Sequence, residues 1–116
     1  MVEAKGRNGH MSFDGDFVTI RRAHFFGRMV DKDGRRVPIA TITEVQFKPA
    51  GGFVNNGFIS LTLTGGVEKR AAFGDRTVDP SNDPNSVLFS TKQQPQFEEL
   101  RTEIETAIAA HHSRPV

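Results

Sequence analysis

The chain of 116 residues contains no cysteine, no tryptophan and no tyrosine. Without cysteine there is no disulfide framework, no thiol nucleophile and no cysteine-ligated metal. Its aromatic side chains, apart from histidine, are ten phenylalanines, whose rings have no polar group to satisfy, so we expect them to fill a core. Hydrophobic residues make up 36% of the chain, which favours one modest core with substantial polar loops.

Long apolar runs and a strong charge excess are also absent. No segment approaches the roughly 20 apolar residues that a membrane-spanning helix needs. The N-terminus, MVEAKGRNGH, has no apolar region typical of a signal peptide, so we expect a cytoplasmic protein with no transmembrane segment. The net charge is +1, whereas nucleic-acid-binding domains usually carry a strong basic excess. The charge balance therefore argues against nucleic acid as a partner.

Most of the chain shows the alternation and turn signals of short antiparallel strands. Asp14-Gly15 and Asp33-Gly34 predict tight turns, because glycine accepts the positive φ that hairpin turns demand. Residues 58–64 form the clearest strand pattern, with apolar residues alternating with residues expected on a more polar face. Further strands are expected around 12–13, 17–21, 36–39, 45–47, 67–73 and 87–90.

The last part of the chain predicts one amphipathic helix that begins near Pro95, a residue suited to the first helical position. Phe97, Leu100, Ile104 and Ile108 are spaced by three, four and four residues and so form one narrow apolar stripe. Such a stripe is typical of a helix that covers a sheet. Strands followed by one closing helix, without βαβ alternation, predict a mainly β domain, a barrel or sandwich of antiparallel sheets capped by the helix.

The order of these motifs resembles a known family. The segments FDGDFVTIRR, RRVPIATITEVQFKPAG, NGFISL and DPNSVLFSTKQQPQFEELRTEIETAI are similar to an actinobacterial family of domains of unknown function, related to bacterial pleckstrin-homology (PH) domains. The similarity runs from about Gly6 to His111, and its last segment is the most specific. It implies a PH-like fold of two antiparallel sheets closed by a C-terminal helix, members in actinobacteria and their phages, and no assigned activity.

We therefore expect a single PH-like domain over residues 6–112, with flexible termini at 1–5 and 113–116. Because PH-like folds serve many purposes, the resemblance by itself implies little about function.

Basic residues gather between positions 21 and 36. This stretch holds six of them against two aspartates: Arg21, Arg22, Arg28, Lys32, Arg35 and Arg36. By resemblance to PH domains that bind phosphoinositides, the cluster is a candidate site for anionic ligands such as lipid head groups. The favoured interpretation is a solvated face, because strand alternation places Arg21 and Arg22 on opposite sides of a sheet, and likewise Arg35 and Arg36.

Three phenylalanines lie close to turn residues and are the candidate partner-binding residues: Phe25, Phe26 and Phe53. Exposed, they would form a protein-binding patch or a membrane wedge. The alternative, which we favour, is that they fill the ends of the β structure.

No pattern points to a metal, a cofactor or a catalytic residue. The aspartates and asparagines of 75–85 do not follow the spacing of an EF-hand. His111 and His112 are adjacent, so on a helix they point about 100° apart and cannot both ligate one metal well. The sequence also lacks a recognisable arrangement of nucleophile, histidine and carboxylate. We expect no metal site and no cofactor, and an enzyme is the least favoured class.

The leading hypothesis is a non-enzymatic PH-like binding module that docks a protein partner or itself. Its groove would lie between the helix and the neighbouring strands, or at a sheet edge that accepts a strand. The alternative is weak peripheral binding to anionic lipid head groups through residues 21–36.

Overall fold

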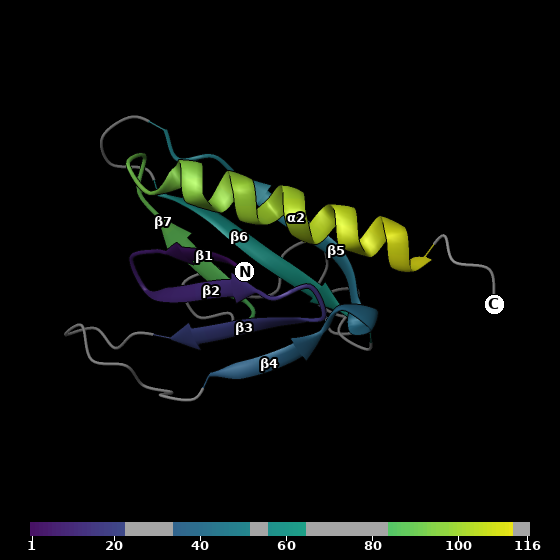
Figure 1. Ribbon diagram of the computed structural model, residues 1–116. Coiled ribbons are helices and arrows are strands. Elements are labelled where there is room, and N and C mark those ends of the chain that lie inside the picture. Colours follow the sequence, from purple (N-terminus) through teal and green to yellow (C-terminus); the bar gives the residue numbers. More distant parts are fainter. Residues whose placement is uncertain (23–33, 52–55, 65–83, 113–116) are drawn as a thin grey trace, which may run out of the picture.

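The computed structural model describes residues 1–22, 34–51, 56–64 and 84–112 (Figure 1). Its elements are β1 (Val2–Lys5), β2 (Gly9–Phe13), β3 (Phe17–Arg22), β4 (Arg35–Pro38), a short 3-10 helix η1 (Ile39–Thr41), β5 (Ile42–Lys48), β6 (Gly57–Leu63), β7 (Ser86–Phe89) and α2 (Gln94–His112). The chain is thus mainly β with a C-terminal helix, which confirms the fold class predicted from the alternation and the apolar stripe. The strand expected at 67–73 lies outside the described residues.

The strands form two antiparallel sheets, with orders β1-β2-β3-β4 and β5-β6-β7. Sequential strands pair as hairpins, for example with Met11 of β2 opposite Ile20 of β3 and Phe47 of β5 opposite Ile59 of β6. The sequence left open whether the sheets form a barrel or a sandwich. The described strands form two separate sheets and not a closed barrel. Figure 1 shows α2 lying along one side of both sheets.

Residues 1–5 are not the flexible terminus that we expected. Val2–Lys5 forms β1, which pairs with β2 so that Ala4 lies opposite Met11, and both side chains are fully buried. Val2 and Ala4 alternate with Glu3 and Lys5 with the period of two of a strand. Four residues are too few for this alternation to stand out in the sequence. The other expected flexible terminus, 113–116, lies outside the described residues.

The turn between β2 and β3 has the predicted glycine geometry. Gly15 has a φ of 106°, and the Asp14 carboxylate accepts the N–H groups of Asp16 and Phe17 at 2.9 and 2.8 Å. The hydrogen bonds from Phe17 and Asp16, helped by the nearby charge of Arg36, lower the pKa of Asp14. Gly34 has a φ of 77°, as expected of the glycine in a tight turn.

The core lies between the inner faces of the two sheets and α2. Phe97, Leu100 and Ile104 of the predicted stripe are fully buried, and Ile108 is half-buried at its end. The Phe97 ring stacks on Phe89 of β7 with the ring centroids 4.7 Å apart. The stripe is therefore the face by which α2 closes the core.

One sequence expectation about burial is wrong. Residues 58–64 were expected to have one apolar and one polar face, yet Ser60 and Thr62 are each only 8% exposed, beside the fully buried Ile59. Small hydroxyl side chains tolerate burial where they find hydrogen-bond partners, so polarity did not mark a solvent face here.

Glutamine side chains at the start of α2 tie the helix to both sheets. The Gln94 side chain accepts the N–H of Ala50, just after β5, at 2.8 Å. The Gln96 side chain accepts the N–H of Lys5, at the end of β1, at 3.2 Å. The helix therefore bridges one strand of each sheet.

Replacing Ile104 with aspartate should lower the free energy of unfolding by about 3 kcal/mol or more, because an unpaired charge would enter the core. Urea denaturation measures the change. Ile108→Asp is the matched control, and we expect it to cost less than half as much because Ile108 is only half-buried. Equal losses in the two variants would contradict the role of the buried stripe.

Candidate functional site

The two sheets have four edge strands in the described part of the chain, and three of these edges are protected. At β7, the N–H of Arg7 donates to the carbonyl of Leu88 at 2.7 Å, and the side chain of Asn8 accepts the N–H of Leu88 at 2.8 Å. At β1, the N–H of Lys5 donates to the side chain of Gln96 in α2 at 3.2 Å. β4 has four residues and ends in Pro38, two features that discourage edge pairing. The fourth edge is β5.

The hydrogen-bonding pattern shows which backbone groups β5 presents at its edge. The N–H of Leu61 in β6 donates to the carbonyl of Asn85, on the side of β7. In an antiparallel ladder, both backbone groups of a residue point to the same side. Val45 lies opposite Leu61, so its N–H and C=O point away from β6, and those of Phe47, two residues further on, do the same. These four groups form the edge, and no described strand pairs with it.

Two features limit the length of this edge that can pair with another strand, one at each end of the segment. The register between β5 and β6 shifts between Ile42 and Glu44, which marks a β-bulge with Thr43 as the extra residue. Beyond Lys48 comes Pro49, which has no N–H to offer. The segment able to accept another strand is therefore 44–48, which we call the β5 edge.

α2 packs on β5, which runs behind the helix in the view of Figure 1. The guanidinium of Arg101 stands 5.0 Å from the centroid of the Phe47 ring and pairs with Glu105 at 3.4 Å. Ile108 follows on the same flank at helical spacing. Val45, Phe47 and Ile108 are half-buried hydrophobic residues packed against the core. We call this strip, Val45, Phe47, Arg101, Glu105 and Ile108, the β5–α2 seam.

The seam offers binding chemistry: backbone donors and acceptors on one side, and partly exposed apolar side chains with an ion pair on the other. An extended chain segment has the complementary backbone groups. The sequence pattern placed Val45 and Phe47 on one face of a strand. It did not show that this strand lies at an edge, because sheet order depends on contacts far apart in the sequence.

The structure splits the basic stretch into two groups. Arg22 donates to the carbonyl of Ser86 at 3.0 Å, and Arg35 donates to the side-chain oxygen of Asn85 at 2.7 Å. Both side chains therefore tie the first sheet to the start of β7. Arg28 and Lys32 lie outside the described residues.

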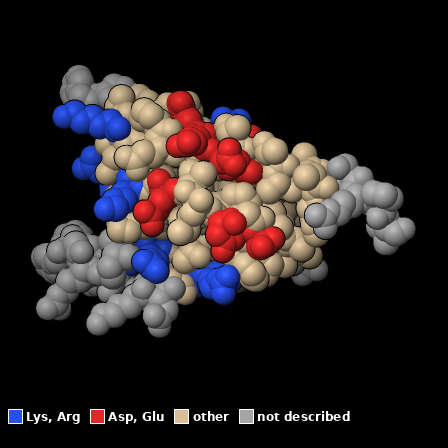
Figure 2. Space-filling model, viewed as in Figure 1, with Lys and Arg blue, Asp and Glu red and all other residues tan. Residues whose placement is uncertain are grey.

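Arg21 and Arg36 point to the opposite face of the first sheet. Figure 2 shows acidic side chains gathered over α2 and the adjoining strands, and basic ones along the left and lower border of the same view. Arg36 stands 4.1 Å from the centroid of the Phe17 ring and 3.9 Å from the carboxylate of Asp14. Its charge is thus partly balanced.

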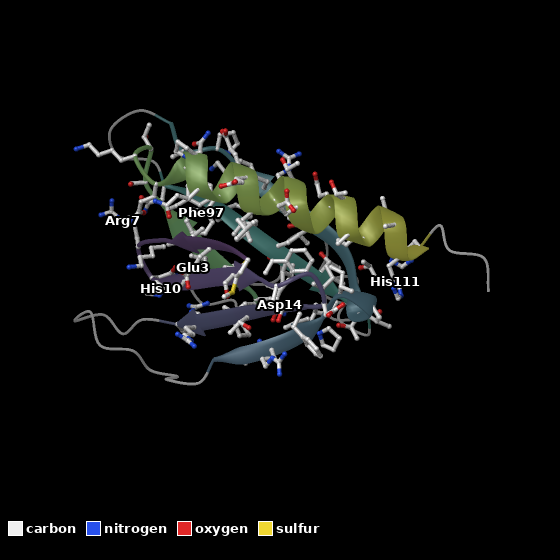
Figure 3. All side chains as sticks on the ribbon, viewed as in Figure 1. Glu3, Arg7, His10, Asp14, Phe97 and His111 are labelled. Carbon is white, nitrogen blue, oxygen red and sulfur yellow. The ribbon has the colours of Figure 1, made fainter. Side chains whose placement is uncertain are left out.

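Arg21 and Arg36 line one hollow of about 290 Å³ on the outer face of this sheet. Glu3, His10, Ser12 and Thr19 also line it, and Figure 3 shows Glu3 on β1 and His10 on β2. The hollow mixes two cations with a carboxylate and two hydroxyls. The hollow brings together these two of the six nominated basic residues, while Arg22 and Arg35 converge on the start of β7.

The nominated aromatic residues Phe25, Phe26 and Phe53 lie outside the described residues. Among the residues that are described, no group of three or more histidine or acidic side chains lies close enough to hold a metal ion. Within the same ranges, no helix has the length and apolar character needed to cross a membrane.

Comparison with known proteins identifies a family. A family model described as a domain of unknown function, DUF4429, matches residues 11–105, a span that runs from β2 into α2 and includes the β5 edge. No curated protein and no solved structure matches the chain. Because the match covers most of its length, the chain belongs to the DUF4429 family of domains of unknown function.

Proposed function

We propose that this chain is a non-enzymatic, PH-like binding module that docks an extended protein segment along the β5 edge, either from a partner or from a second copy. The observation that carries the proposal is the outward direction of the backbone groups of Val45 and Phe47 on an edge that no described strand covers. Two antiparallel sheets with a C-terminal helix are also the arrangement that resemblance to PH domains implies, which supports the PH-like assignment.

Strand addition would use both sides of the seam. Main-chain hydrogen bonds to the β5 edge supply affinity, and alternate side chains of the docked segment supply specificity. Four such bonds at about 1 kcal/mol each give about 4 kcal/mol. Micromolar binding needs about 8 kcal/mol, so the docked segment must also bury apolar side chains. Val45, Phe47 and Ile108 are the half-buried residues positioned to receive them.

Val45→Pro should weaken docking, because it removes an outward N–H without removing a hydrogen bond to β6. Val45→Thr is the matched control, since it keeps the N–H and a β-branched side chain. Peptides selected from a random phage-displayed library on the immobilised wild-type chain serve as probes in calorimetric titration. We expect at least a tenfold loss of affinity in V45P and less than a threefold loss in V45T.

Backbone amide shifts of the wild-type chain provide a second measurement that does not depend on the stability of a variant. Selected peptides should perturb the amides of 44–48 and of the α2 flank around Arg101. Perturbation confined to other strands, or equal affinity for V45P and V45T, would contradict docking at the β5 edge.

Weak peripheral binding to anionic lipid head groups is the second candidate function. It is favoured by the shared hollow, where the guanidinium groups of Arg21 and Arg36 accompany the hydroxyls of Ser12 and Thr19. Guanidinium and hydroxyl groups are donors that suit a phosphate. Glu3 in the hollow and the pairing of Arg36 with Asp14 oppose an anion, so any such binding is weak.

Arg21→Ala should reduce the fraction of protein that sediments with phosphatidylserine-containing vesicles at low salt, by about half or more. Arg7→Ala is the control, since it removes the same charge from an exposed residue that does not line the hollow. Capture should fall as salt rises, because exposed charges are screened. No capture at low salt, or equal losses in R21A and R7A, would contradict lipid binding through this hollow.

A further inference from the structure

The β5 edge reads Glu44-Val45-Gln46-Phe47-Lys48. A second strand that approaches it in antiparallel orientation meets this sequence in reverse. When the second strand is another copy of the same segment and the two-fold axis passes at Gln46, Glu44 of one copy faces Lys48 of the other. In the same register Val45 faces Phe47, and Gln46 faces itself.

We infer that the occupant of the β5 edge is a second copy of this chain, paired antiparallel through β5 so that two three-stranded sheets join into one six-stranded sheet. The inference rests on the proposed function and names the docked segment. Its basis is the self-complementarity of 44–48: two opposite-charge pairs, two apolar pairs and one amide pair.

The backbone independently favours the same register. Val45 and Phe47 direct their N–H and C=O outward, so Val45 of one copy and Phe47 of the other form a hydrogen-bonded pair, twice over the two-fold axis. Glu44, Gln46 and Lys48 then fall at the pairs without backbone hydrogen bonds, where opposing side chains lie closest. The charged and amide pairs therefore lie where contact is best.

Other two-fold registers use less of the edge. Moving the axis to Val45 places Phe47 opposite the bulged residue Thr43 and leaves Lys48 without an opposing residue on the edge. Moving the axis to Phe47 places Val45 opposite Pro49, which has no N–H. The register centred on Gln46 pairs all five residues of each copy.

The apolar part of the seam also fits a second copy. Val45 and Phe47 are half-buried. In the dimer, Val45 of each copy would be covered by Phe47 of the other copy. Among the residues that the structure describes, the large hydrophobic side chain classed as exposed is Met1, which is not part of the seam. A five-residue strand pair is small beside the roughly 1,200–2,000 Å² of a stable interface. We therefore expect a dimer that forms in the micromolar range.

Sedimentation equilibrium of the full chain and its charge-reversal variants tests the inference. The mass of the wild type should rise with concentration from 12.8 kDa toward twice that value. Glu44→Lys and Lys48→Glu should each weaken self-association at least tenfold, because each places like charges opposite one another twice. The double variant E44K/K48E should return within about threefold of the wild type.

Mixing the two single variants adds a sharper requirement. E44K carries two lysines on its edge and K48E carries two glutamates, so an equimolar mixture should form the heterodimer although each variant alone stays monomeric. Both positions are exposed, so melting temperatures close to that of the wild type are expected.

A wild type that stays monomeric at millimolar concentration would overturn the inference, and so would a dimer that both single reversals leave intact. Neither result removes the proposed function, because peptides could still bind the β5 edge and lose affinity in V45P. Conversely, a second-copy dimer that is insensitive to V45P would overturn both.

Discussion

The structure depends on the docking of α2 across two sheets that do not close on each other. Phe97, Leu100 and Ile104 are fully buried, and the side chains of Gln94 and Gln96 bond to the backbone just after β5 and at the end of β1. Burying each of the three side chains is worth about 1.5–3 kcal/mol. The apolar stripe therefore supplies most of the free energy with which α2 packs on the sheets. The two glutamines fix where along the sheets the helix begins.

The position of the helix determines which backbone groups remain for binding. α2 packs on both β1 and β5, and the turn between β1 and β2 bonds to the backbone of β7. An uncapped strand edge favours pairing with another chain. The bulge at Thr43 and Pro49 limit that pairing to five residues, which keeps the contact short and its register defined. The edge position of β5 among the described strands is thus a consequence of how the fold closes its core.

Local patterns could be predicted from the sequence, and long-range relations could not. The stripe of α2 depends on residues three or four apart, and the turn at Gly15 on a single dipeptide, so both were predicted correctly. The separation of Arg21 from Arg22 follows from strand alternation and was also foreseen. The edge position of β5 depends on sheet order, and the roles of Gln94 and Gln96 depend on partners 44 and 91 residues away.

Amide hydrogen exchange at single-residue resolution, followed by NMR on a dilute sample, tests the open β5 edge most directly. We expect the N–H groups of Val45 and Phe47 to exchange at nearly unprotected rates, while the N–H of Gln46, which faces Ser60 of β6, is protected. Equal protection of all three amides in the dilute chain would contradict this expectation, because the β5 edge would then already be covered.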